Sequence, residues 1–326
     1  MSGALADVDS LVTSYVGEDH EIRVICGPTA AGKSAVAMFL AARMRSAIVS
    51  ADSRQVYRGF DIGSAKPSVA ERAAVVHRGI DIIDPGDRYS AAAWAAAADG
   101  WIEESLQSGT APLVVGGTGL YLRALFEGLF DEPALEPARR EQLASVTGAF
   151  DVPELRRWVT HLDPGRATLG RTQLLRVIEI ALLTGHRMSD LHRDRARRAR
   201  WRPRYLVVDP GAALADRIGR RIDDMLDHGW MDEVRQLMET VPAAAPAWKT
   251  TGYDAVRRLV SGSLSLAQAR EIILIETRQY AKRQRTWFRH QLPADRVTRL
   301  DPTTSDWHAV AERWAASPAH SSGTSA

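Results

Sequence analysis

The chain has 326 residues, 45% of them hydrophobic, and a formal net charge of +2, which is enough to bury a substantial core in one large domain or two ordinary ones. Its apolar runs are broken well short of the ~20 residues that a membrane span requires, and its acidic N-terminus lacks the basic and apolar regions of a signal peptide, so we expect a cytoplasmic protein without a membrane anchor. The single cysteine, Cys26, excludes an intramolecular disulfide and a multi-cysteine zinc site, and we expect it in a buried strand.

The first part of the chain alternates short apolar strands with helices. Residues 22–26 and 47–53 read as buried strands, and residues 111–129 read as a strand, a turn and a helix. Between them, the alanine-rich residues 89–109 form a strong helix pattern that Gly109 closes. This alternation predicts an α/β fold with a parallel sheet covered by helices on both faces.

The β pattern disappears between about 130 and 200. Three stretches there, separated by proline and glycine, have helical character: PARREQLASV, VPELRRWVTHL and RTQLLRVIEIALLTGH. A helical insertion is the simplest interpretation. Residues 204–210 restore a strand, and amphipathic helices follow to about residue 290. The last ten residues, SPAHSSGTSA, have no large apolar side chain to bury and are expected to be disordered.

The segment GPTAAGKS, residues 27–34, joins the first strand to a helix and matches the phosphate-binding pattern G-x-x-x-x-G-K-S. The glycines let backbone N–H groups face a ligand, and the helix N-terminus adds its dipole. Lys33 supplies a positive charge, and the hydroxyl of Ser34 can bind Mg²⁺. The pattern therefore predicts a site for phosphate groups.

Asp52 follows the second strand, at the sheet edge where open parallel sheets bind their ligands. From the sequence alone, this carboxylate is a magnesium ligand, a general base or a surface turn residue. An ATPase would carry another aspartate after an apolar strand, yet PLVVGG ends in Gly-Gly-Thr. Asp84 and Asp209 also follow apolar runs, but we interpret both as turn or cap residues.

Residues 277–290 contain no acidic residue. At ~100° per residue on a helix, four cations share one narrow stripe while Tyr280 and Trp287 face the other way. The stripe consists of Arg278, Lys282, Arg285 and Arg289. It favours contact with a nucleic-acid backbone over a plain solvated face. A second basic run, residues 187–204, has eight arginines and two aspartates and fits a flexible linker equally well.

Several stretches together resemble the tRNA dimethylallyltransferase family, in its compact bacterial form. They are GPTAAGKS, SADSRQVYRGFDIGSAKP, HRGIDIIDPGDRYSAAAW, PLVVGGTGLYLRALFEGL, LLRVIEIALLTG, DRIGRRIDDMLDHGWMDEV and ETRQYAKRQRTWFRH. The resemblance spans about residues 22–290. It implies transfer of a dimethylallyl group from dimethylallyl diphosphate to the exocyclic amine of the adenosine 3′-adjacent to the anticodon, with release of diphosphate and with Mg²⁺ as cofactor.

The resemblance also implies roles for individual residues. Asp52 becomes the general base, and Thr118 lies at the reaction centre. The implied diphosphate-binding residues are Gly27, Thr29, Ala30, Ala31, Gly32, Lys33, Ser34 and Arg221, with Ser34 also on the metal. The implied tRNA contacts of the core are Asp52, Ser53, Arg54, Gln55, Lys249, Thr251, Gly252, Tyr253, Arg278, Lys282, Arg283, Gln284, Arg285, Trp287 and Arg289. Those of the insertion are Arg140, Gln173 and Arg176, although GRTQLLRVIE departs from the usual family pattern.

These observations predict a P-loop NTPase-like core formed by residues 20–130 and 203–312, with a helical, tRNA-binding insertion at 131–202. Residues 1–19 and 313–326 are predicted to be flexible termini, and we expect a monomer. Three other functions remain open at this stage. They are a P-loop small-molecule kinase, a prenyltransferase for free adenine nucleotides and a non-catalytic RNA-binding protein; the basic helix disfavours the first two, and Asp52 beside the phosphate loop disfavours the third.

Overall fold

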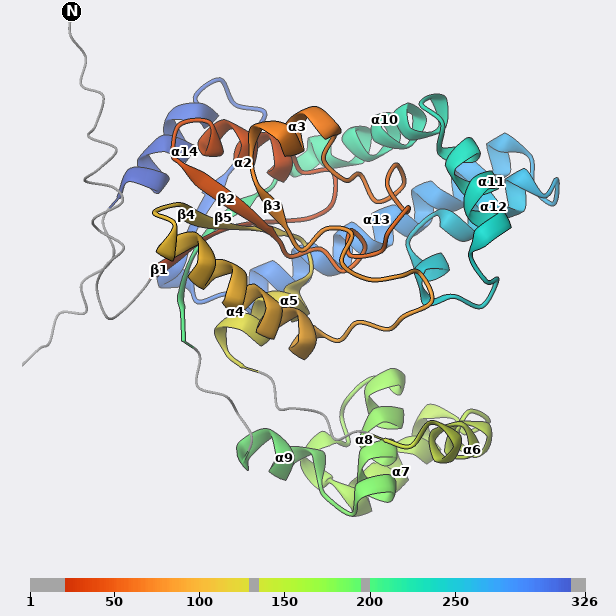
Figure 1. The fold of residues 1–326 in the computed structure, drawn as a ribbon. Coiled ribbons are helices and arrows are strands. Elements are labelled where there is room, and N and C mark those ends of the chain that lie inside the picture. The colour runs from red at the N-terminus through yellow and green to blue at the C-terminus, as the bar shows by residue number, and fades with distance from the viewer. Residues whose placement is uncertain (1–20, 129–134, 195–199, 318–326) are drawn as a thin grey trace, which may run out of the picture. The chain divides into compact units, whose positions relative to one another are not determined.

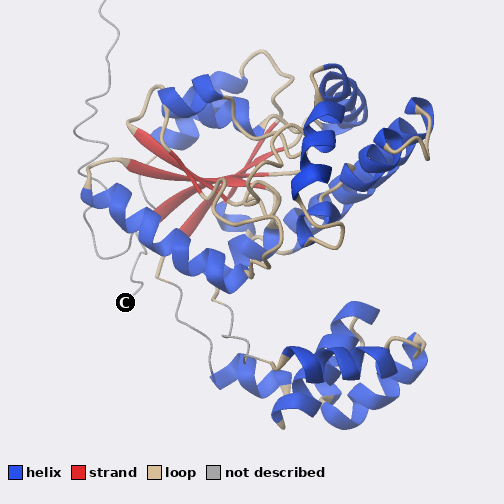
Figure 2. Cartoon of the chain, turned by 45° about the vertical axis from the view of Figure 1, so that its right-hand side comes forward, coloured by secondary structure: helices blue, strands red, loops and turns tan. Residues whose placement is uncertain are grey.

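The computed structural model describes residues 21–128, 135–194 and 200–317. A six-stranded sheet forms the middle of its larger unit, with strand order β3-β2-β4-β1-β5-β6. Figure 2 shows the strands in red at the centre of this unit, with helices around them. The strands are β1 (Glu21–Cys26), β2 (Ser46–Ser50), β3 (His77–Arg78), β4 (Ala111–Gly116), β5 (Arg202–Val208) and β6 (Val297–Leu300). All neighbouring strands pair in parallel, so the predicted parallel sheet is confirmed.

The central strands are buried on both faces, which explains why their sequences are mostly apolar. In β1, Val24 pairs in register with Val114 of β4 and with Tyr205 of β5. Cys26, the last residue of β1, is fully buried as expected. Strand β2 ends at Ser50, earlier than the pattern of residues 47–53 suggested.

Helices cover both faces of the sheet (Figure 1). The helices of this unit are α2 (Lys33–Ala41), α3 (Val69–Ala74), α4 (Ala91–Gln107), α5 (Gly119–Phe126), α10 (Leu214–Asp227), α11 (Trp230–Thr240), α12 (Tyr253–Val260), α13 (Leu266–His290) and α14 (Trp307–Ala316). Helices α2 and α14 pack together on one face, and α4 and α5 pack together on the other. There, the rings of Trp94 and Tyr121 stack with centroids 4.6 Å apart.

Local sequence signals set the ends of the long helices. Helix α4 begins after Ser90, whose hydroxyl accepts the amide of Ala93, and it stops just before Gly109 at φ +64°. Helix α13 begins with a capping box between Ser265 and Gln268. These caps explain why both helices were predictable from their sequence.

A second compact unit spans residues 127–199. Its helices are α6 (Pro137–Thr147), α7 (Val152–Leu162), α8 (Arg171–Thr184) and α9 (Met188–Asp194). Asp151 and Glu154 form a capping box at the start of α7, and Leu155, Val177 and Ile178 belong to a small core between α7 and α8. The three helices predicted here are confirmed.

The predicted flexible C-terminus begins too early. Helix α14 extends to Ala316, and Trp314 and Ala315 are buried in the main core. The reason is packing, because Ala311, one turn before, is also buried and completes an apolar face. Residues 1–19 and 318–326 lie outside the described residues. Across the part of the chain that the structure covers, no helix is both long and apolar enough to span a bilayer.

Candidate active site

The phosphate loop runs from the end of β1 to the start of α2. Gly27 has φ +145°, and a Cβ there would lie 2.2 Å from the carbonyl oxygen of Val208, so only glycine fits. Gly32, at φ +104°, caps the N-terminus of α2. The Nζ of Lys33 donates a hydrogen bond to the carbonyl oxygen of Pro28 at 2.8 Å. This geometry aims a cation and the positive end of a helix at the same space.

Burial destabilises the positive charges of Lys33 and Arg221 beside this loop, and a bound anion would offset that destabilisation. Burial lowers the pKa of Lys33 to about 8. The negative charge of Asp52 opposes this shift, and the positive charge of Arg221 adds to it. Burial also lowers the pKa of Arg221, again opposed by Asp52. A ligand with negative oxygen atoms would stabilise the charged state of both side chains. The charges therefore favour a phosphate-bearing ligand.

Asp52 lies two residues beyond the end of β2, at the carboxyl edge of the sheet. Its Oδ1 accepts a hydrogen bond from the backbone N–H of Arg54 at 2.9 Å. Thr118 follows the neighbouring strand β4. Its Oγ1 accepts a hydrogen bond from the backbone N–H of Ser53 at 3.0 Å and donates one to the hydroxyl oxygen of Ser53 at 3.3 Å. The ends of β2 and β4 are thus tied together beside the carboxylate.

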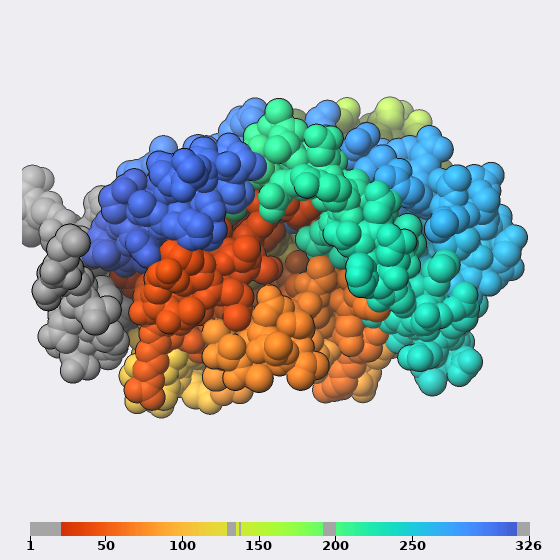
Figure 3. Space-filling view, turned by 90° about the horizontal axis from the view of Figure 1, so that it is seen from above, coloured from red at the N-terminus to blue at the C-terminus, as the bar shows by residue number. Residues whose placement is uncertain are grey.

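Three pockets that share lining residues surround these groups. The first has an empty volume of about 740 Å³, part of it open to solvent, and Lys33, Ser34, Asp52 and Arg221 line it together with Thr29. The second, of about 610 Å³, shares Thr29, Asp52 and Arg221 with the first. The third lies between the loop and α10. Figure 3, seen from above, shows the surface hollowed between α10 and the segment around α3.

Apolar side chains form the other walls of the first two pockets. Met38, Ile48 and Val115 line the first. The apolar lining of the second consists of Ile218, Ile222, Met225, Trp230 and Ile273. A ligand that joins a charged head to an apolar group suits such a site, because the cations and the apolar walls adjoin one another. Of the predicted diphosphate residues, Thr29, Lys33, Ser34 and Arg221 line the first pocket with Asp52, and Ala30 and Gly32 line the other two. Gly27 and Ala31 are buried in the loop.

Two of the predicted tRNA contacts use their side-chain amides for hydrogen bonds inside the protein, and their contact with tRNA stays a prediction. Gln284 is buried; its Oε1 accepts the amide of Thr29 and its Nε2 donates to the carbonyl oxygen of Gly117, both at 2.8 Å. Gln55 accepts the hydroxyl of Ser50 at 2.9 Å and donates to backbone carbonyls of the chain near residue 65. Both glutamines hold loops in place.

The segment 249–253 divides into exposed and buried residues. Lys249 is exposed and Thr251 lines the second pocket, which leaves both as predicted contacts. Gly252 is buried, and so is Tyr253, whose hydroxyl donates to Glu233 at 2.6 Å. The prediction of surface contacts by Gly252 and Tyr253 is corrected for this reason. Ser53 and Arg54 are partly exposed, and Arg54 lines the second pocket.

The cationic stripe of α13 is shorter than its spacing suggested. Arg278, Lys282 and Arg289 are exposed, and so is Arg283. Arg285 instead forms an ion pair with Asp209, and its Nε donates to Oδ2 at 2.9 Å. It is therefore not the freely exposed cation that was predicted, because a carboxylate from the end of β5 neutralises it.

The packing of Trp287 is confirmed. Its ring fills the space beside Gly119, where an added Cβ would lie 2.3 Å away, and the guanidinium of Arg123 lies 5.8 Å from the ring centroid. The side chain is only partly exposed, so its predicted contact with tRNA stays a prediction.

In the helical unit, the predicted contacts have partners of their own. Arg140 and Arg176 both form ion pairs with Glu179, and these hydrogen bonds hold the pKa of Glu179 below its usual value although burial alone would raise it. Gln173 is exposed at the start of α8, where its side chain accepts the amide of Gly170. Contact of these residues with tRNA stays a prediction.

Sequence reasoning missed two arginines of α10. The Nε of Arg217 donates to the carbonyl oxygen of Ala30 in the phosphate loop at 2.9 Å, and Arg220 lines the third pocket. With Arg221 they are spaced i, i+3 and i+4, which places all three on one helix face. That signal was present in DRIGRR, but only Arg221 was read from it.

Tyr280 was also missed, because helical spacing assigned it only to packing. It lines the second pocket and interacts with Thr118. Burial, followed by the charge of Asp52, raises the pKa of Tyr280 to about 12. The phenol therefore stays protonated and can donate a hydrogen bond beside the carboxylate.

Comparisons with known proteins agree with this geometry. The IPP transferase family model matches residues 55–291, and the isopentenyl transferase model matches residues 20–78. A tRNA dimethylallyltransferase from Anaeromyxobacter sp. (strain Fw109-5) is 40% identical over 278 residues, which cover 83% of this chain and 92% of that protein. One from Synechococcus sp. (strain JA-2-3B'a(2-13)) is 40% identical over 281 residues, which cover 82% and 76% of the two chains.

Solved structures show the same fold. The tRNA isopentenylpyrophosphate transferase of Bacillus halodurans aligns with a TM-score of 0.65 at 31% identity, covering 92% of this chain and 95% of its own. A eukaryotic dimethylallyltransferase acting on tRNA aligns with a TM-score of 0.75 at 26% identity, covering 90% and 77%. The P-loop NTPase-like fold expected for the core is thereby confirmed.

Proposed function

The chain belongs to the IPP transferase family, and we propose that it transfers a dimethylallyl group from dimethylallyl diphosphate to the exocyclic amine of the adenosine 3′-adjacent to the anticodon in tRNA. One observation carries the proposal: Lys33, Arg221 and Asp52 line one pocket with the phosphate loop. A carboxylate among cations suits a reaction in which an anion departs and an amine loses a proton.

Different side chains of the protein have different roles in the transfer. The amine nitrogen forms a bond to the first carbon of the dimethylallyl group while the bond from that carbon to the diphosphate oxygen breaks. Lys33, Arg221 and the loop N–H groups stabilise the negative charge that develops on the departing diphosphate. Asp52 takes the proton from the amine nitrogen. Thr118 positions the Asp52 loop through Ser53.

The residues present fit a magnesium ion shared with the substrate. Ser34 and Asp52 line the same pocket as Lys33, and Mg²⁺ commonly takes one or two protein oxygens together with phosphate oxygens. Among the described residues, no group of three His, Cys, Asp or Glu side chains could hold a metal by itself, which suits an ion that needs the diphosphate. Ser34 would hold it, and the ion would neutralise charge on the leaving diphosphate.

Exposed cations support a polynucleotide acceptor. Arg278, Lys282 and Arg289 lie exposed along one face of α13, where phosphates of a folded RNA could neutralise them. The target base must leave its stack to reach Asp52. We also propose that the enzyme acts in the cytoplasm as a monomer.

The test is incubation of the purified protein with tRNA, dimethylallyl diphosphate and Mg²⁺ but no ATP, followed by mass spectrometry of the tRNA nucleosides. We expect a dimethylallyl mass increment on adenosine and release of diphosphate. AMP in place of tRNA serves as the control acceptor. Prenylation of AMP alone would favour a free-nucleotide prenyltransferase, and strict dependence on ATP would favour a kinase.

A further inference from the structure

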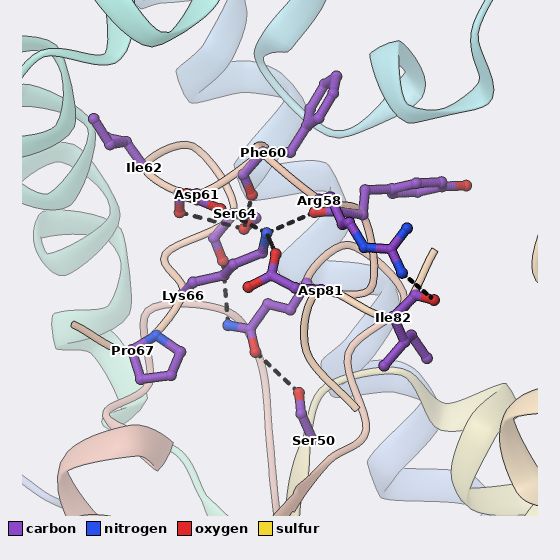
Figure 4. A network of polar contacts seen from close by, with 12 residues as sticks. Ser50, Arg58, Phe60, Asp61, Ile62, Ser64, Lys66, Pro67, Asp81 and Ile82 are labelled. Carbon is purple, nitrogen blue, oxygen red and sulfur yellow. Dashed lines mark hydrogen bonds and ion pairs between the residues drawn. The ribbon is translucent and has the colours of Figure 1, made fainter. Parts of the chain in front are cut away.

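A buried ammonium group outside the proposed catalytic set lies in the loop that follows Asp52. The side chain of Lys66 is 1% exposed. Its Nζ donates to the carbonyl oxygen of Tyr57 and to Oδ1 of Asp61, both at 2.6 Å, and it forms an ion pair with Asp81 (Figure 4). Lys66 thus joins the loop to a segment that follows β3.

The chain on either side of Lys66 forms a wall of the first pocket. Ala65 and Pro67 line that pocket with Ser64, whereas Lys66 itself is not among the lining residues. The Lys66 side chain reaches the carboxylates of Asp61 and Asp81, as Figure 4 shows. On the same stretch, Gln55 donates to the carbonyl oxygen of Ala65 at 3.0 Å. The wall is therefore held by Gln55, by Lys66 and by Arg72, whose Nε donates to the carbonyl oxygen of Pro67 at 3.0 Å.

The ammonium has few substitutes in this position. Ala65 has φ +49°, an uncommon left-handed conformation for a residue other than glycine, which surrounding contacts must maintain. Replacing Lys66 removes one ammonium that three oxygen acceptors share, on Tyr57, Asp61 and Asp81. Asp81 would keep its ion pair with Arg72, which also donates to the carbonyl oxygen of Pro67 at 3.0 Å. The carbonyl oxygen of Tyr57 and the carboxylate of Asp61 would lose the ammonium that now joins them to residue 66.

A nearby ion pair provides the matched comparison. Arg58 pairs with Asp84 and donates to the carbonyl oxygen of Ile82 at 3.3 Å, so it joins the same two segments as Lys66. The Arg58 and Asp84 side chains are 53% and 69% exposed. Exposed pairs contribute little because water screens them. The two pairs therefore differ in burial, not in the segments that they connect.

We propose that Lys66 is a positioning residue of the first pocket, where the donor would bind. Lys66 holds residues 64–67 in the shape that the prenyl diphosphate requires. The identity of that donor rests on the proposed function. Lys66 touches neither donor nor acceptor in this assignment. It acts through the backbone of Ala65 and Pro67.

The experiment compares Lys66→Met with Arg58→Met. For Lys66→Met we expect KM for dimethylallyl diphosphate to rise ~10-fold or more and kcat to fall, while the dissociation constant for tRNA stays within ~2-fold. For Arg58→Met we expect every parameter within ~2-fold of wild type. Circular dichroism and thermal melts verify that each variant is folded at the assay temperature. Equal behaviour of the two variants, or equal loss of donor and tRNA binding in Lys66→Met, overturns the proposal.

Two further measurements keep the proposal testable if Lys66→Met does not fold. Asp81→Asn keeps the shape of the acceptor but removes its charge, and it should raise the donor KM in the same direction; an unchanged KM counts against the proposal. Calorimetry with inorganic diphosphate needs no prenyl transfer, so it separates this inference from the proposed function. We expect Arg58→Met to bind diphosphate with the affinity of the wild type and Asp81→Asn to bind it more weakly. Equal diphosphate affinities of the two variants would contradict the role of Lys66.

Discussion

The cations of the pocket and the cations of α13 differ in what surrounds them. Lys33 and Arg221 are partly buried, and burial lowers the pKa of each. Arg278, Lys282 and Arg289 are exposed to water, where salt screens them. Partly buried cations can stabilise charge that develops during a reaction, whereas exposed cations attract a polynucleotide without taking part in bond changes. Four experiments can break or sharpen this comparison.

The largest effect is expected at the carboxylate between the pocket cations. Asp52→Ala should lower kcat by ~10²-fold or more, because the general base is lost, and should change tRNA affinity by only a few-fold. Single-turnover kinetics and filter binding measure the two quantities. Asp84→Ala, which removes an exposed carboxylate, is the control and should retain normal turnover. Near wild-type turnover by Asp52→Ala would mean that another group is the base.

The next effect concerns the pocket cation itself. Lys33→Ala should raise KM for dimethylallyl diphosphate and also lower kcat, each by ~10-fold or more, because its charge acts on both the bound and the departing diphosphate. Steady-state kinetics with varied donor supply the test. Lys282→Ala removes an exposed cation of α13 and should leave the donor KM unchanged. If the two variants lost donor affinity equally, the distinction between the two sets of cations would be lost.

A pH series probes the lowered pKa of Lys33. Because this pKa is about 8 rather than its usual 10.5, the side chain loses its proton as the pH rises above 8, and donor affinity falls with it. The decline should approach ~10-fold per pH unit. Calorimetry between pH 7 and 9.5 follows it. Lys33→Ala has no ammonium to titrate and should show a flatter profile; a parallel decline in both proteins would assign the pH effect to another group.

The smallest effect is expected on α13. Replacing Arg278 and Lys282 by alanine should raise the tRNA dissociation constant and flatten its salt dependence by up to about one unit of slope per lost phosphate contact. Filter binding across a salt series measures both. Arg285→Ala is the comparison, because Asp209 already neutralises Arg285, and it should alter the slope less. An unchanged slope in the double variant would identify the stripe as a solvated helix face.

The local sequence was sufficient wherever a feature depends on neighbouring residues. Gly27 and Gly32 mark the phosphate loop because their backbone angles exclude other residues. Asp52 could be placed beside the loop because β1 and β2 are parallel strands that end at one edge of the sheet. The helices of residues 137–184 were predictable from caps and breaks in their own sequence.

Only the tertiary structure decided which polar side chains remain available to a ligand. Helical spacing placed Arg285 on the exposed stripe. Its ion-pair partner Asp209 lies 76 residues away in sequence, and no local pattern predicts that pairing. Gln284 likewise contacts Thr29 across 255 residues. Such partners meet only when the sheet brings the ends of distant segments together. The sequence by itself determined the loop, the carboxylate and the strands β1, β2, β4 and β5, because these follow from short-range sterics and periodicity. The short strands β3 and β6 were not predicted, and long-range pairing placed them in the sheet. Burial and long-range pairing also decided which of the remaining candidates can act.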